Sequence, residues 1–189
     1  MRLHLPNPSF KNPVFSCIVA LSLGLLSPSF ADTQAISLNG DQAVKFSHSP
    51  QMQFKGENSA EGISMEFQGM AGSPNWMQAL IPCEWTLPKD GQIELDVRSS
   101  PAINRYFAIS IQTADGMKYQ GKLSDSPTGF KFSTDKTTEM ILLSDLVAQD
   151  GSHPSADAAV THVGLVMTTV PEESPKTVFV SEIRLTSDE

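Results

Sequence analysis

Short runs of alternating apolar and polar residues, separated by Gly, Pro, Asn and Asp, recur about every ten residues over most of the chain. This rhythm is typical of all-β proteins, and helical periodicity is scarce. No repeat or shift of composition marks a second domain. The pattern predicts one all-β domain, an antiparallel β-sandwich, with one helical turn at Ser144–Ala148. The expected strands are Ala43–Ser47, Gly62–Gln68, Trp76–Ile81, Gln92–Arg98, Tyr106–Thr113, Met117–Leu123, Gly129–Ser133, Glu139–Leu143, Thr161–Thr169 and Lys176–Thr186.

The dipeptide Asp115-Gly116 marks a hairpin and allows its register to be predicted. With a three-residue loop, Ile111 pairs with Tyr119, so that apolar side chains meet on one face. A two-residue loop pairs Ile111 with Gln120 and mixes the two faces, because a shift by one residue turns every side chain over. The sequence therefore favours the three-residue loop.

The strands expected around this hairpin each have a polar side. Along Tyr106–Thr113 the odd-numbered residues are mostly apolar and face the core, Phe107 among them, and Gln92–Arg98 divides in the same way. The pattern predicts a sheet whose outer face is wholly polar. Its outward side chains include Tyr106, Ser110, Gln112 and Arg98.

This polar face is a candidate sugar-binding surface. Sugars are bound by side chains that form hydrogen bonds beside an aromatic ring, and Tyr106 shares its strand face with Ser110 and Gln112. Trp76 and Trp85 are further candidates for stacking. The alternative is that these residues have structural roles only, since an antiparallel sheet commonly exposes one face to solvent and large aromatic rings commonly pack in the core.

The first 31 residues have the features of an export signal. A positively charged start with Arg2 and Lys11 precedes the apolar run Val14–Leu26, and small residues then lead to Ala31. We expect residues 1–31 to be removed and residues 32–189 to form the domain. The apolar run is too short to span a bilayer, so we expect no membrane insertion of the mature chain. The predicted location is the periplasm or the medium.

The charge balance bears on possible partners. The whole chain has 13 basic and 21 acidic residues; removal of Arg2 and Lys11 leaves 13 − 2 = 11 bases, a net charge of 11 − 21 = −10. A field of this sign repels phosphate backbones and anionic membranes. Nucleic acid is therefore not an expected partner.

Motifs of catalysis are missing from the sequence. It contains no G-x-S-x-G, H-E-x-x-H, P-loop or strand-following G-x-G-x-x-G motif. Glu94 and Asp96 lie two residues apart on one strand face, and their separation overlaps the distance between the two catalytic carboxylates of glycosidases. A row of solvated charges along the strand is the simpler explanation. Cys83, the single thiol of the expected mature chain, is predicted to be a buried, unreactive residue. We expect no enzymatic activity.

From Trp85 onward the order of segments resembles the galactose-binding-like jelly roll of many carbohydrate-binding modules. The matching pieces are Trp85–Leu87 before Gln92–Arg98, the hairpin at Tyr106–Ile111 with Asp115-Gly116, the segment Met140–Leu146, and the closing strand Val178–Leu185. The resemblance implies a jelly-roll sandwich that binds a carbohydrate. The portion from Tyr106 to Leu146 also resembles the complex I intermediate-associated protein family.

The resemblance also raises the question of a metal. Many such modules place a calcium-ligating Asp in the closing strand, where this chain has Ser181 followed by Glu182. A carboxylate oxygen of Glu182 suits a hard cation, but the pattern departs at Ser181. We expect no cofactor, and Glu182 is the single candidate calcium ligand.

Together these observations predict an exported, non-catalytic protein that binds a polysaccharide or another cell-envelope component. The alternative is a structural protein that docks an envelope protein, because interfaces favour Met and Met65, Met70 and Met77 lie close together in sequence. Core packing explains methionines equally well. A hydrolase whose active site assembles in space is a third alternative.

Overall fold

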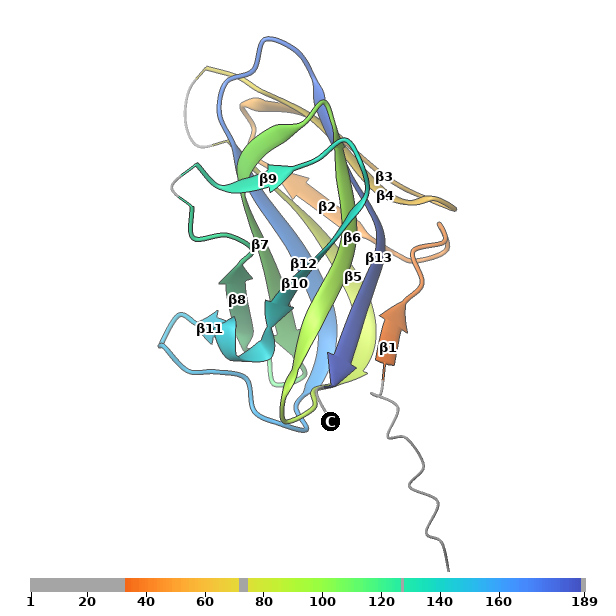
Figure 1. Cartoon of the computed structure of the whole chain (residues 1–189), viewed down its shortest axis with the longest axis vertical. Coiled ribbons are helices and arrows are strands. Elements are labelled where there is room, and N and C mark those ends of the chain that lie inside the picture. Colours follow the sequence, from red (N-terminus) through yellow and green to blue (C-terminus); the bar gives the residue numbers. More distant parts are fainter. Residues whose placement is uncertain (1–32, 72–74, 127, 188–189) are drawn as a thin grey trace, which may run out of the picture.

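Two antiparallel sheets, packed face to face, make up the described part of the chain (Figure 1). The structure is a computed structural model that describes residues 33–71, 75–126 and 128–187. The predicted export signal, residues 1–31, lies outside the described residues. The all-β antiparallel sandwich of jelly-roll type that the sequence predicts is confirmed.

Sheet A faces the viewer in Figure 1. Its strand order is β10-β6-β13-β4-β3, and β1 pairs with the half of β13 that β4 leaves unpaired. The strands are β1 (Thr33–Ile36), β3 (Met52–Ser59), β4 (Gly62–Gly69), β6 (Gly91–Ser100), β10 (Thr137–Leu142) and β13 (Lys176–Ser187).

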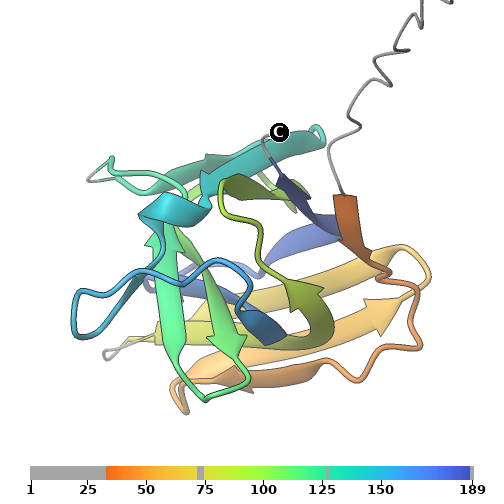
Figure 2. The same cartoon turned by 90° about the horizontal axis from the view of Figure 1, so that it is seen from below.

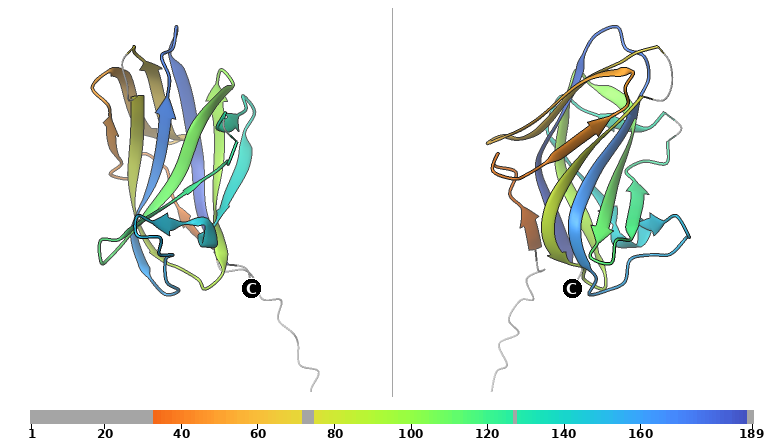
Figure 3. Two further views of the ribbon diagram at one scale, coloured as in Figure 1. Left: turned by 90° about the vertical axis from the view of Figure 1, so that its left-hand side faces the viewer. Right: turned by 180° about the vertical axis from the view of Figure 1, so that it is seen from behind.

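Sheet B is seen from its outer side in Figure 3, right, where β2, β5, β12, β7 and β8 lie side by side. Its order is β11-β8-β7-β12-β5-β2, and β9 pairs with the first residues of β7. The strands are β2 (Lys45–His48), β5 (Asn75–Thr86), β7 (Ile103–Thr113), β8 (Lys118–Lys122), β9 (Phe130–Phe132), β11 (Val147–Ala148) and β12 (Ala159–Thr169). The 3₁₀ turn η1 (Leu143–Asp145) lies with β11 at the end of the sandwich seen in Figure 2.

The core fills the space between the sheets with the inward residues of each strand. Phe107 is 1% exposed and packs against Phe130 and Phe132, with ring centroids 6.2 and 5.1 Å away. Met65 and Met77 are also fully buried, so only Met70 of the three methionines considered for docking has an exposed side chain. The methionine argument for a protein-docking surface therefore does not hold, because two of its residues fill the core.

The predicted hairpin register is confirmed. Ile111 pairs with Tyr119 across a three-residue loop, and both side chains are buried. Asp115 shapes the loop, because its carboxylate accepts hydrogen bonds from the Thr113 hydroxyl and the Met117 amide. Gly116 has a φ of 88°, a conformation that glycine adopts without strain.

Two expectations about the strands were wrong. β1 and β3 were not predicted; in β3 the inward position Gly56 lies directly under the Phe46 ring, where a Cβ atom would be 2.4 Å from ring carbons. This glycine interrupts the apolar alternation that identifies a strand. The helical turn expected at Ser144–Ala148 lies at Leu143–Asp145, and Val147–Ala148 form the short strand β11 instead. In the described residues, no helix is long and apolar enough to cross a membrane.

The polar faces of β6 and β7 do not belong to one sheet. β6 lies in sheet A and β7 in sheet B, so Arg98 and Tyr106 point to opposite sides of the sandwich. The prediction of a single wholly polar face is wrong for sheet B as well, since Leu80 and Val166 occupy outward positions there. Alternation shows which residues of a strand share a face, but it carries no information about which strands are neighbours.

Candidate functional site

Two aromatic rings lie in one row across the outer face of sheet B. Thr168 of β12 pairs with Trp76 of β5 on one side and with Tyr106 of β7 on the other. Both aromatic side chains are half-buried and Thr168 is exposed. Since neighbouring strands are about 4.8 Å apart, the two residues are separated by about 10 Å across the sheet. The row is wide enough for an extended ligand to contact both rings.

A hydrogen bond positions the ring of Tyr106. Gln120 of β8 donates from Nε2 to the Tyr106 hydroxyl at 2.8 Å. Gln120 pairs with Ser110, four residues along β7, so the Tyr106 side chain must lean along its strand over Ala108. Ala108 faces outward in the alternation and is nevertheless 0% exposed. The Tyr106 ring therefore lies across the face as a platform.

Polar side chains meet at the centre of the same face. Gly164 of β12 pairs with Ser110 of β7 and with Leu80 of β5. A Cβ atom at Gly164 would lie 2.3 Å from Ser110 Oγ and 3.1 Å from Gln78 Nε2. Glycine in a strand interior commonly marks such a close approach. The missing side chain lets two hydrogen-bonding groups lean over the middle of the sheet.

Gln112 belongs to the far end of this face. Its row across sheet B contains Pro82, His162 and Lys118. Gln112 and His162 are half-buried, and Lys118 is exposed. The face therefore offers rings at one end, hydrogen-bonding groups in the middle, and an imidazole with an ammonium group at the other end.

A hollow of about 360 Å³ adjoins Tyr106. Tyr106, Lys122 and Thr168 line it from the sheet, and the loop between β8 and β9 contributes Ser124 and Asp125. The same loop reaches Gly129, where a Cβ atom would be 2.4 Å from the Arg105 carbonyl carbon, so its end packs tightly on β7. The aromatic row thus continues into a cleft with polar walls.

An ion pair fixes the end of β7 beside the hollow. Arg105 contacts the carboxylate of Glu172, and its Nε donates to Thr169 Oγ1 at 3.0 Å. The two charged side chains are only 16% and 10% exposed, and burial lowers the pKa of Arg105. This pair joins the first residues of β7 to the segment that follows β12, so the residues at the Tyr106 end are held in place.

The structure brings four of the predicted ligand-binding residues to one face and removes two from it. Tyr106, Ser110, Gln112 and Trp76 share the outer face of sheet B. Trp85 is 4% exposed in the core, so its ring is not open to a ligand. Arg98 lies on the outer face of sheet A, with its guanidinium 4.1 Å from the centre of the Phe179 ring. Strand order, which alternation does not contain, decides the outcome for Arg98, whereas Trp85 is buried because it shares the inward side of β5 with Met77, Ala79 and Ile81.

Glu182 lies in a cluster that already contains a cation. Arg184 contacts three carboxylates on the outer face of sheet A: Glu182 at 2.7 Å, Glu94 at 3.2 Å and Asp96 at 3.4 Å. Burial alone would lower the pKa of Arg184, but these hydrogen bonds and charges outweigh burial and raise it. Among the described residues, no three His, Cys, Asp or Glu side chains are grouped as a metal would require. The oxygens that calcium would use are held by a guanidinium, so these residues do not fit a calcium ion.

The same contacts bear on the two carboxylates considered for catalysis. Asp96 is 5% exposed; it accepts hydrogen bonds from Thr138 at 2.6 Å and from Lys136 at 2.9 Å. Burial would raise its pKa, but these bonds and the charge of Arg184 lower it on balance. A carboxylate held ionised in this way stabilises the sheet and is poorly suited to act as a general acid. Lys118 and Lys122 do not contribute to this cluster, because β8 lies in the opposite sheet.

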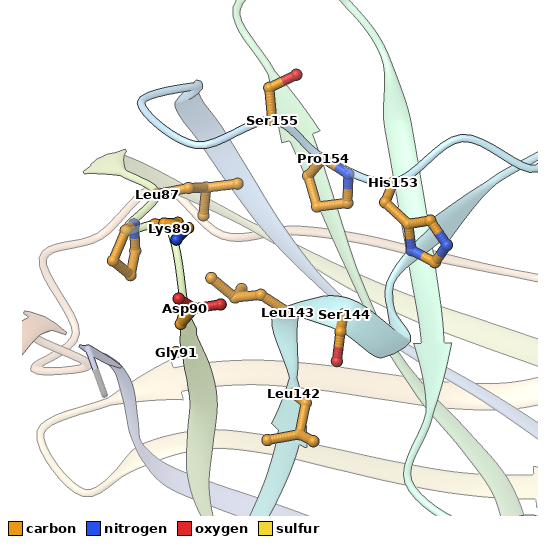
Figure 4. A pocket seen from close by; sticks show the side chains of 11 residues that line it. Leu87, Lys89, Asp90, Gly91, Leu142, Leu143, Ser144, His153, Pro154 and Ser155 are labelled. Atoms are coloured by element: carbon orange, nitrogen blue, oxygen red, sulfur yellow. The ribbon is translucent and has the colours of Figure 1, made fainter. Parts of the chain in front are cut away.

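A second hollow, of about 190 Å³, lies at the other end of the sandwich (Figure 4). Leu87 and Leu143 point toward each other across it, and Asp90 lies at its side. His153 is held at its rim by a 3.0 Å contact between Nδ1 and the Leu146 carbonyl oxygen. The residues that line it include no Phe, Tyr or Trp ring on which a sugar could stack, so the outer face of sheet B is the stronger candidate site.

Three residues of the face were not predicted as site residues: Gln78, Gln120 and Thr168. Gln120 is a polar residue next to Tyr119, and nothing in the sequence pairs it with Tyr106. Gly164 was the one signal that could have indicated Gln78, because a glycine inside an otherwise regular strand points to a close neighbour.

No protein-family model and no curated protein sequence matches this chain. Solved structures do. A family 30 carbohydrate-binding module is similar with a TM-score of 0.54 at 14% identity, over 82% of this chain and 99% of that chain. The module CtCBM11 is similar with a TM-score of 0.52 at 15% identity, over 86% and 99%. An agarase matches with a TM-score of 0.51 at 11% identity, but the match covers only 25% of the agarase.

At these identities the comparisons show the fold. They confirm the resemblance to carbohydrate-binding modules at the level of the β-sandwich. They give no support to the resemblance to the complex I intermediate-associated protein family. Matches include both solved chains that consist of a single module and segments of much longer enzymes.

Proposed function

We propose that this protein is a non-catalytic glycan-binding protein whose binding surface is the outer face of sheet B. The observation that carries the proposal is the row Trp76–Thr168–Tyr106, in which two half-buried rings lie in line across the sheet. An aromatic ring offers a flat apolar surface with polar neighbours, which suits the apolar faces and hydroxyl edges of a sugar.

The hydrogen-bonding groups lie where such a ligand would need them. Ser110 and Gln78 lean together over Gly164, and Gln120 approaches the Tyr106 hydroxyl. A sugar stacked on the rings would meet hydroxyl and amide groups in the adjoining rows of the sheet. The fold supports the proposal further, since similar sandwiches include modules described as carbohydrate-binding.

Export belongs to the same proposal. A binder of envelope or extracellular polysaccharides must leave the cytoplasm, and residues 1–31 have the features of a signal that would be cleaved after Ala31. N-terminal sequencing of the protein recovered from the periplasm or medium would test this step. We expect the mature chain to begin at Asp32; a full-length chain retained in the cytoplasm would refute export.

Affinity electrophoresis tests the binding itself. Wild-type protein would be run through native gels that contain cell-wall, storage or algal polysaccharides. We expect at least one of them to retard wild-type protein and to retard Tyr106→Ala and Trp76→Ala clearly less. Phe179→Ala is the matched control, because Phe179 is a half-buried ring on the outer face of the other sheet. Equal mobility of all proteins in every gel would refute the proposal.

A further inference from the structure

The charges on the two outer faces of the sandwich differ in kind. The outer face of sheet A has acids and bases in contact, with Glu94, Asp96 and Glu182 around Arg184 and with Lys55 at 3.2 Å from Glu57. On the outer face of sheet B, the rows that run from Trp76 to Pro82 contain lysines and a histidine and, among the described residues, no Asp or Glu.

The bases of this face are Lys45, Lys118, Lys122 and His162. All three lysines are exposed, and within the described residues none of them forms a salt bridge. Acids that flank the face lie beyond these rows: Asp125 in the loop at the Tyr106 end, and Glu84 and Asp115 past the opposite end.

This distribution is unexpected for so acidic a chain, in which 21 acids face 13 bases. A surface that carries positive charge without internal partners attracts anions, and charge complementarity favours one class of ligand over another. Lysines on edge strands also discourage the edge of the sheet from pairing with another molecule. That role does not require acids to be excluded from the inner strands of the sheet.

The positions of the lysines match a long ligand better than a small anion. Lys118 and Lys122 are four residues apart on β8, about 13 Å, and Lys45 lies on β2 at the other side of the sheet, four strand spacings or about 19 Å away. Lys122 also lines the hollow beside Tyr106. The charges are therefore spread along the face from the aromatic row toward its other end instead of converging on one point.

We propose that the glycan bound on sheet B is acidic, a polysaccharide whose sugar units carry carboxylate groups. This inference rests on the proposed function and specifies its ligand class. Sugar rings stack on Trp76 and Tyr106, while their carboxylates lie near Lys118, Lys122 and Lys45. The chain's overall negative charge limits binding to polyanions in general, so the rings are required in addition to the lysines.

The test compares each acidic polysaccharide with its own neutral form. Polygalacturonate, alginate and hyaluronate would each be titrated beside the carboxyl-reduced polymer, which keeps its linkages and loses its charge. We expect wild-type protein to bind at least one acidic polymer, and its reduced form about tenfold more weakly. Added salt should weaken binding of the acidic form more than binding of any neutral form.

Paired variants locate the effect. Lys118→Gln/Lys122→Gln should weaken binding of the acidic polymer about tenfold and leave the fold intact, since both side chains are exposed. The control Lys55→Gln/Lys89→Gln removes the same charge from exposed sites outside this face, one on sheet A and one in the loop at the other end of the sandwich, and should bind like wild type.

Each other outcome overturns the inference in a recognisable way. If neutral polymers bind as tightly as acidic ones and Tyr106→Ala abolishes both, the proposed function stands and the acidic ligand class is wrong. If duplex DNA binds as tightly as the acidic polymers, the face is a general polyanion site and the inference fails. If no polysaccharide binds, both the inference and the proposed function fail.

Discussion

Trp76 and Tyr106 both pair with Thr168, one from each side, although 30 residues separate them in sequence (106 − 76). β5 and β7 are not neighbours; β12, from late in the chain, lies between them. The row exists only because of this crossover, and the proposed binding surface depends on it. Small outward residues of β12, such as Gly164, also leave room for the side chains of both neighbouring strands.

Alanine substitutions of the neighbouring residues Phe107 and Tyr106 should distinguish a core position from a surface position. Phe107→Ala should lower the free energy of unfolding by about 3–5 kcal/mol, because it removes a buried ring from a cluster of three phenylalanines. Tyr106→Ala should cost about 1 kcal/mol or less, since the side chain is half-buried on the surface. Urea denaturation followed by circular dichroism would measure both. A larger loss from Tyr106→Ala than from Phe107→Ala would mean that the faces of β7 are inverted.

Asp96 should make the stability of the protein depend on acidic pH. Its pKa is held below the ordinary value, so its ionised form stabilises the fold at pH values above the unfolded pKa, about 3.9. That contribution is lost as the pH falls through the lower folded pKa. Asp96→Asn should be less stable than wild type by about 1–3 kcal/mol at pH 7, and the difference should shrink in acid.

Thermal unfolding at pH 7 and at pH 3 would measure this difference. Asp135→Asn is a suitable control, because Asp135 is exposed and forms no salt bridge with the described residues. An Asp96→Asn protein as stable as wild type at pH 7 would show that the cluster around Arg184 contributes nothing to stability.

Cys83 should be inert in the folded protein. The thiol packs against the core, its Sγ lies 3.7 Å from the Val160 carbonyl oxygen, and burial raises its pKa to about 12. Because the thiolate is the reactive form, labelling by a bulky thiol reagent at pH 8 should be slow in buffer and fast in denaturant. Rapid labelling of native protein, or a disulfide-linked dimer on a non-reducing gel, would contradict the burial.

The strand pattern of the sequence predicts local structure well and long-range neighbours poorly. The Asp115-Gly116 turn and the alternation around it are enough to predict the pairing of Ile111 with Tyr119 and the opposite directions of Tyr106 and Phe107. These relations depend only on residues close in sequence.

The errors concern relations between distant segments. Arg98 was grouped with Tyr106 because both lie on polar strand faces, but the chain passes from one sheet to the other between β6 and β7. Trp85 lies on the same side of β5 as Met77, Ala79 and Ile81, and that side faces the core. No feature of the sequence distinguishes Gln120, which belongs to the candidate site because it donates a hydrogen bond to the Tyr106 hydroxyl.

The most direct test of the proposed binding face is a map of where a glycan binds. Amide chemical shifts of isotopically labelled protein would be followed by NMR during titration with an oligosaccharide of the best polymer from the gels. We predict that the shifts concentrate on β5, β12, β7 and β8, around Trp76, Gly164, Ser110 and Gln120. Shifts centred instead on the hollow at Leu87 and Leu143, or on the outer face of sheet A, would contradict the account.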